Sequence, residues 1–176
     1  MDTLTTTHLP PSTLADAEGD AAQRQRTLRA IQRRSFAVLS TVSPAGFPHA
    51  AGVAYCAVGS TLYVSTERGS RKARNVAADE RVALVVPVRR LPVGPPFTVQ
   101  LQARATVLAV DDAEIVDLVA AGALRRITGH GELDLPDGCF LRIVPNGPVH
   151  TYGIGVSALA VARDPLHVGP RSVDLR

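Results

Sequence analysis

One lysine stands out among the residues whose type and spacing could do chemistry. Lys72 is the only lysine among 19 basic residues, and it lies in the run GSRKARN at positions 69–75. A strand-like apolar segment at 62–66 precedes this run and a short helical pattern follows it. The free N–H groups and dipole of a helix N-terminus attract anions, and Ser70 as the N-cap adds a hydroxyl. The sequence therefore predicts a phosphate site to which Arg71 and Lys72 bring two charges.

The alternative is an ordinary capped helix whose basic first turn is solvated. Cations at a helix N-terminus oppose the dipole, at a cost of about 0.3–1 kcal/mol each unless an anion is present. This cost favours the anion site, although spacing alone leaves both interpretations open.

No catalytic constellation of side chains accompanies this run. The histidines follow no metal-ligand spacing, so we expect no metal site; they are His8, His49, His130, His150 and His167. Cys56 and Cys139 lie in apolar runs without a CxxC pattern and are expected to be core thiols. Residues 153–158 match G-x-G-x-x-A, but too little chain follows for the βαβ unit of a dinucleotide site. With catalytic residues unknown, the sequence points to chemistry carried by a bound cofactor.

Composition limits the class of protein. The chain has 176 residues, 45% hydrophobic and 20% charged, which is typical of one soluble globular domain. A net charge of +3 and an aromatic content of 4% without Trp argue against nucleic-acid binding. Neither a signal peptide nor a membrane-spanning run is recognisable, so we expect no membrane association and a cytoplasmic location.

The pattern of elements is mainly β. We expect a flexible tail over 1–22, an amphipathic helix with a basic face over 23–34, and a turn-rich connection over 89–96. Gln100 and Gln102 lie on the polar face of the clearest alternating strand. Strands are predicted at 35–42, 48–58, 61–66, 81–88, 98–109, 139–144 and 148–153. About six short strands joined by hairpins predict an antiparallel barrel with helices around it, followed by an extended tail over 161–176.

The segments 36–42, 46–50, 62–66 and 70–75, in this order, resemble the flavin-binding split barrels related to pyridoxamine 5'-phosphate oxidase. The similarity runs over roughly 35–155. It implies an α+β, mainly β fold: a six-stranded antiparallel split barrel over 23–160 with a few flanking helices. It further implies a homodimer with FMN at the subunit interface.

The resemblance also implies roles for particular residues. Arg71 and Lys72 would hold the FMN phosphate, helped by Thr66 and Ser70. Other residues would lie along the isoalloxazine ring, and these are Ser40, Thr41, Tyr63 and Ser65. Gln100 or Gln102 would reach the flavin or phosphate from the partner subunit. The implied activity is that of a flavin-dependent oxidoreductase, which transfers hydride to or from a small molecule.

The chain departs from pyridoxamine 5'-phosphate oxidases in two places. The arginine and lysine expected on the strand at 51–56 are missing, as is the arginine-rich substrate motif at 151–155. A small molecule other than a B6 vitamer is therefore the expected substrate. Two alternatives share the fold. One is a reductase that uses the deazaflavin F420, whose polyglutamate tail could bind Arg24, Arg29 and Arg33. The other is a non-catalytic flavin- or haem-binding protein.

Overall fold

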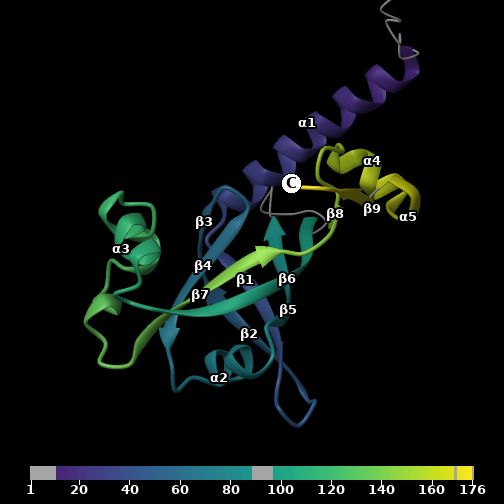
Figure 1. Ribbon diagram of the computed structural model, residues 1–176. Helices are drawn as coiled ribbons and strands as arrows, with labels where there is room; N and C mark the ends of the chain where they lie inside the picture. Colours follow the sequence, from purple (N-terminus) through teal and green to yellow (C-terminus); the bar gives the residue numbers. More distant parts are fainter. Residues whose placement is uncertain (1–10, 89–96, 169, 176) are drawn as a thin grey trace, which may run out of the picture.

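The structure is a computed structural model that describes residues 11–88, 97–168 and 170–175. One curled antiparallel sheet forms the body, and a few helices surround it (Figure 1). The strands are β1 (Phe36–Val42), β2 (Pro48–Ala54), β3 (Cys56–Val58), β4 (Thr61–Glu67), β5 (Arg81–Val88), β6 (Phe97–Ala109), β7 (Gly138–Pro145), β8 (Val149–Tyr152) and β9 (Pro170–Val173). The helices are α1 (Pro11–Arg33), α2 (Arg71–Ala78), α3 (Ala113–Ala120), α4 (Ala158–Arg163) and α5 (Pro165–Val168), with 3₁₀ turns η1 (Arg125–Ile127) and η2 (Glu132–Asp134).

The sheet has the order β2-β1-β5-β6-β7-β4-β3, and β8 pairs with both β6 and β9. This mainly β, curled arrangement is the predicted fold class, although the described residues form nine strands rather than about six. One added strand arises at Tyr55, which divides the segment predicted at 48–58. Its N–H donates to the Ser35 carbonyl at 2.9 Å and its hydroxyl to the Ile31 carbonyl at 2.7 Å. The chain thereby leaves β1, the partner of β2, and pairs β3 with β4.

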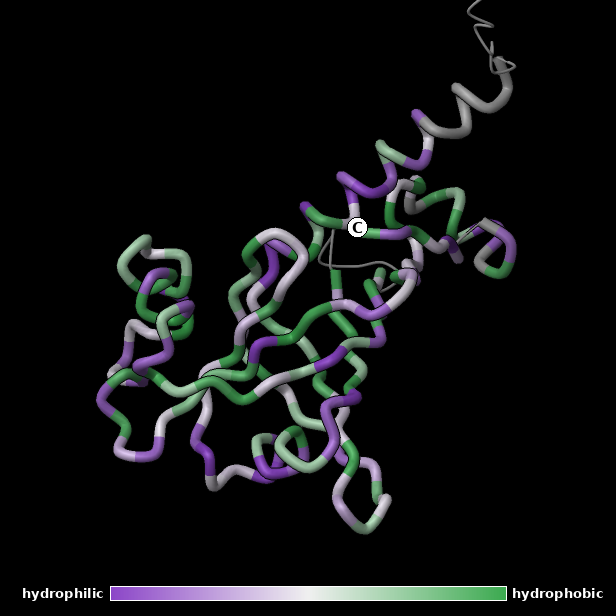
Figure 2. Tube along the Cα trace, viewed as in Figure 1, coloured by the Kyte–Doolittle hydropathy of each residue, from purple (hydrophilic) through white to green (hydrophobic). Residues whose placement is uncertain are grey.

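Alternation along β1, β5 and β6 gives this part of the sheet a buried and an exposed face. The hydropathy of the residues changes along the strands (Figure 2). Leu39, Leu84 and Leu101 lie opposite one another on β1, β5 and β6, and all are buried in the core. One position along, Ser40, Ala83 and Gln102 form the matching row on the outer face. The register of the strands thus determines which side chains lie on the outer face, where they can contact a ligand.

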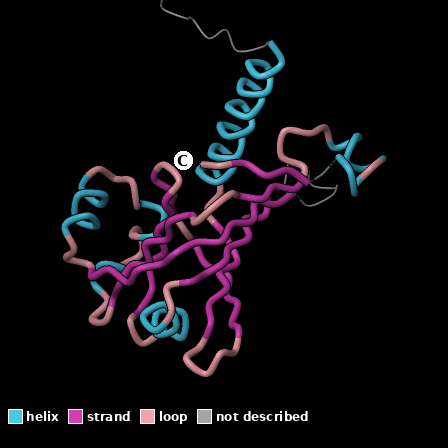
Figure 3. Tube along the Cα trace, turned by 45° about the vertical axis from the view of Figure 1, so that its right-hand side comes forward, coloured by secondary structure: helices cyan, strands magenta, loops and turns pink. Residues whose placement is uncertain are grey.

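The N-terminal boundary was predicted wrongly. Helix α1 begins at Pro11, so 11–22 is not a flexible tail, and residues 1–10 lie outside the described part. Pro suits the first turn of a helix, and the many alanines at 15–22 favour its continuation. Gln23, Thr27 and Ile31 recur every four residues and are buried, which fixes the C-terminal half of α1. The rest of the helix stands away from the sheet (Figure 3).

The C-terminal boundary is also different from the expected extended tail over 161–176. Helix α4 starts after Ser157, whose Oγ accepts from the Ala160 N–H at 3.1 Å. Helix α5 follows, and β9 then pairs with β8. The predicted connection over 89–96 lies outside the described residues. Among those that are described, no helix is long and apolar enough to cross a membrane.

Candidate functional site

The start of α2 has the local geometry that the sequence predicts. Ser70 is the N-cap, and its Oγ accepts from the Ala73 N–H at 3.3 Å. The hydroxyl of Thr66, near the end of β4, donates to the same Oγ at 3.1 Å. The structure thus brings Thr66 and Ser70 together with the first-turn residues Arg71 and Lys72.

Positive charge gathers at this helix start, where the nearby carboxylate is that of Asp137, beside Gly69. Arg71 is exposed, Lys72 is half-buried, and the first turn of α2 contains no acidic residue. Within the described part of the chain, neither residue forms an ion pair, and nor does Arg68 just before the helix. Arg74 is turned to the backbone, where Nη1 donates to the Gly69 carbonyl at 2.6 Å. With one carboxylate against three cations, this helix N-terminus keeps an excess of positive charge that a bound anion would balance.

Arg68 was not among the predicted residues, although it begins the same basic run. Its position is visible in its effect on Cys139, which lies opposite Thr66 on β7. Burial raises the pKa of the Cys139 thiol, and the negative charge of Asp137 also raises it, while the positive charges of Arg68 and Lys72 act to lower it. Both cations therefore lie near the junction of β4, β7 and α2. The buried Cys139 keeps its proton and remains the core thiol that we expected.

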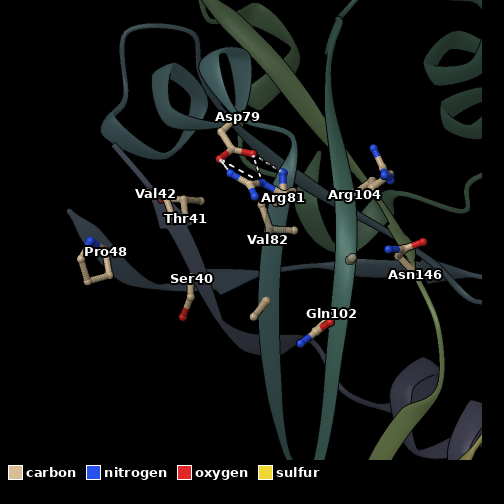
Figure 4. A pocket seen from close by; sticks show the side chains of 12 residues that line it. Ser40, Thr41, Val42, Pro48, Asp79, Arg81, Val82, Gln102, Arg104 and Asn146 are labelled. Carbon is tan, nitrogen blue, oxygen red and sulfur yellow. Dashed lines mark hydrogen bonds and ion pairs between the residues drawn. The ribbon is translucent and has the colours of Figure 1, made fainter. Parts of the chain in front are cut away.

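A groove of about 460 Å³ lies near the other end of α2, over β1, β5 and β6 (Figure 4). Its lining includes the outer-face row of Ser40, Ala83 and Gln102. Asn146 stands at its edge, where its N–H donates to the Gln102 carbonyl at 2.9 Å. Two predicted residues from distant parts of the sequence, Ser40 and Gln102, are thus brought to one surface.

The charged groups in this groove are already paired. Arg81 donates from Nη2 to Asp79 Oδ2 at 2.7 Å and from Nε to Oδ1 at 3.0 Å. These hydrogen bonds hold the pKa of Asp79 at about 2. Arg104, on the neighbouring strand, pairs with Glu80 through one contact from Nη1 to Oε1. The groove therefore has less unpaired positive charge to attract an anion than the start of α2 has.

Thr41 follows Ser40 at the groove, but its side chain points to the buried face of the sheet. Its side chain is buried, and Oγ1 accepts from Nδ2 of the equally buried Asn75 at 2.9 Å. This bond fastens α2 to β1 and so sets the helix against the sheet. Asn75 was not predicted, because a polar residue in a helix gives no sign of the strand it will face.

Tyr63 and Ser65 lie away from both the groove and the start of α2. The Tyr63 hydroxyl donates to Glu114 of α3, which also accepts from Arg142 Nε at 2.9 Å. Burial, then the bond to Glu114, raises the pKa of Tyr63 to about 12. Ser65 is opposite Phe140, which belongs with Tyr63 to a second hydrophobic cluster beneath α3. The structure does not bring this pair together with the other predicted residues.

Gln100 and His49 are two further polar residues on the strands of the sheet. Gln100 is exposed two positions before Gln102, outside the groove, and its Nε2 donates to Thr98 Oγ1 at 3.2 Å. His49, opposite Thr41 on β2, has a buried Nδ1 without a hydrogen-bond partner in the described structure. The described residues contain no group of three or more acidic, His or Cys side chains that could hold a metal.

Comparison with known proteins agrees with this fold. Residues 24–146 match the family model described as pyridoxamine 5'-phosphate oxidase, which covers more than half of the chain. The chain therefore belongs to the pyridoxamine 5'-phosphate oxidase family, as the resemblance in the sequence predicted. No curated protein matches the chain in sequence.

Solved structures are similar at low sequence identity. The haem storage protein HutZ from Vibrio cholerae is 18% identical with a TM-score of 0.62, covering 78% of this chain and 95% of its own. A haem-binding protein from Mycobacterium smegmatis is 19% identical with a TM-score of 0.64, covering 88% and 58%. General stress protein 26 from Bacillus anthracis is 20% identical with a TM-score of 0.53, covering 73% and 92%. At these identities the likeness establishes the fold alone.

Proposed function

We propose that this protein binds FMN through the start of α2 and is an oxidoreductase acting on a small molecule. The observation that carries the proposal is the cluster of Arg68, Arg71 and Lys72, which form no ion pair within the described structure. Family membership supports a flavin, since the matched region includes this cluster.

The residues at the helix start suit a phosphate dianion. The N–H groups of Arg71 and Lys72 and the Ser70 hydroxyl offer hydrogen bonds, and the cations offer charge. Thr66 helps by donating to Ser70 Oγ and so orienting that hydroxyl. FMN, when bound, would supply hydride transfer. The chain's own part is then to hold the phosphate, to orient the ring and to exclude water. In the groove, Ser40 and Gln102 offer a hydroxyl and an amide to a polar ring edge or to a substrate.

The outer face of the sheet supports a homodimer. Phe36 and Val85 are 50% and 37% exposed, and the Phe36 ring lies across Gly52 on the same face. Exposed apolar side chains on a sheet face are typical of an interaction surface. Because the groove opens on this face, a second copy would enclose the cofactor and contribute Gln100 or Gln102 to it.

We expect Val85→Asp to convert the dimer to a monomer without unfolding it. The change places a charge in the middle of the proposed interface, where desolvating it is costly. Sedimentation velocity measures the outcome. Val116→Asp is the matched control, because Val116 is 50% exposed but lies on α3. A Val85→Asp protein that stays dimeric would exclude this face as the interface.

The cofactor is tested by titrating cofactor-free protein with FMN and F420 by fluorescence, and with haemin by its Soret absorbance. We expect FMN to bind in the micromolar range or tighter with one molecule per chain. Preferential binding of F420 would support the deazaflavin alternative, which the exposed Arg24, Arg29 and Arg33 of α1 favour. Anaerobic reduction by NADH or NADPH then separates an enzyme from a flavin carrier.

Haem binding is the second candidate, and His49 favours it. Imidazole is a common metal ligand, and the buried Nδ1 of His49 has no hydrogen-bond partner in the described structure. Of the structurally similar proteins, one is described as a haem storage protein and another as a haem-binding protein. Tight binding of haemin that His49→Ala abolishes, together with failure to bind either flavin, would replace the FMN proposal.

A further inference from the structure

A second, separate pocket of about 260 Å³ lies between α1, β3 and the turn around η1. Its lining comes from three distant segments: Gln32; Cys56 and Ala57; and Gly122, Ala123, Arg125 and Arg126. None of these residues belongs to the start of α2 or to the groove over β1, β5 and β6. We call it the Arg125–Arg126 pocket.

The two arginines present unpaired charge to this pocket. Both are exposed, and neither forms an ion pair with any residue that the structure describes. The Gln32 amide is fixed by donating to the Gly59 carbonyl at 3.1 Å.

Gly122 lets the Arg125 guanidinium lie against the backbone. A Cβ at position 122 would come within 2.7 Å of Arg125 Nε and 3.1 Å of Cζ. The planar head therefore lies beside the backbone at Gly122, where any larger residue would displace it.

We propose that the Arg125–Arg126 pocket binds a phosphate group of a small molecule, independently of the proposed FMN site. Two guanidinium forks that line one pocket match the oxygens of a phosphate, which accept several hydrogen bonds at once. The volume is below the range of about 300–1,000 Å³ typical of drug-sized ligands, which favours a compact anion. Inorganic pyrophosphate is therefore a suitable probe.

Cys56 provides a reporter at this pocket, and the fully buried Cys139 provides an unreactive reference. Cys56 lines the Arg125–Arg126 pocket, whereas Cys139 lies near Lys72 and Arg68. The full-length protein is treated with iodoacetamide, with and without pyrophosphate at constant ionic strength, and the labelling rate of each cysteine is followed by mass spectrometry. At about ten times the dissociation constant, pyrophosphate is expected to slow the labelling of Cys56 about tenfold.

The variants separate the two sites. Arg125→Ala/Arg126→Ala is expected to lose the protection of Cys56, while Arg71→Ala/Lys72→Ala keeps it. Arg163→Ala/Arg171→Ala removes the same charge from exposed positions elsewhere and should also keep it. Isothermal titration calorimetry gives a second measurement that does not depend on thiol reactivity. The heat of pyrophosphate binding is expected to be smaller for Arg125→Ala/Arg126→Ala than for the wild type.

The proposal is overturned if Cys56 is protected equally in the Arg125→Ala/Arg126→Ala protein, or if sodium sulfate and sodium chloride protect as well as pyrophosphate. It is also overturned if calorimetry detects no difference between that variant and the wild type. Failure of FMN to bind leaves these outcomes unchanged, because the two sites share no residue.

Discussion

Replacing Arg71 and Lys72 together by alanine is expected to weaken FMN binding by a factor of about 10² to 10⁴. Each side chain would give the phosphate a charge-assisted contact worth about 1.5–3 kcal/mol, and about 1.4 kcal/mol corresponds to a factor of ten. The fold should survive, because Arg71 is exposed and neither side chain pairs with a described acidic residue. Alanine also favours the helix and removes cations that oppose its dipole.

Fluorescence titration at fixed ionic strength measures the change, and circular dichroism confirms the fold. Arg163→Ala/Arg171→Ala is the control for the loss of two positive charges, since both residues are exposed far along the chain from α2. Arg68→Ala should give an intermediate loss if its guanidinium reaches the same phosphate. A folded double variant that binds FMN with unchanged affinity means that the phosphate lies elsewhere.

The start of α2 was predictable because capping is local. A strand, a turn, Ser70 and the following helix occupy adjacent positions, so the sequence alone places Thr66, Ser70, Arg71 and Lys72 near one another. The strand that carries Gln102 was also predictable from local sequence, because its polar and apolar residues alternate. Its meeting with Ser40 could not be derived from spacing, since it depends on β5 lying between β1 and β6.

The face of a strand was harder to predict than its existence. Ser40 and Thr41 are neighbours, so their side chains point to opposite faces, and only the structure shows that Thr41 is buried against Asn75. Tyr63 and Ser65 were grouped with the cofactor by resemblance, but α3 covers their side of β4. The sequence of β4 alone does not indicate that a helix some fifty residues later will pack against it.

The glycines of the 153–158 segment are expected to matter for packing, so Gly153→Ala should destabilise the protein by about 2–5 kcal/mol. Gly153 has φ of +75°, and an added Cβ would lie 2.0 Å from Cδ1 of Phe97, which is 1% exposed. The left-handed backbone costs an alanine about 1–2 kcal/mol, and overpacking a closed core adds about 1–3 kcal/mol. Urea denaturation measures the loss.

Gly147→Ala separates these two costs. Gly147 has φ of +88°, yet an added Cβ there would meet nothing within 4 Å, so this variant should lose only the backbone part. The difference between the two variants then reports the displacement of the Phe97 ring. If Gly153→Ala is no less stable than Gly147→Ala, the ring yields freely and the packing argument fails. A folded fraction of Gly153→Ala that binds FMN normally would agree with rejecting this glycine pattern as a dinucleotide-binding turn.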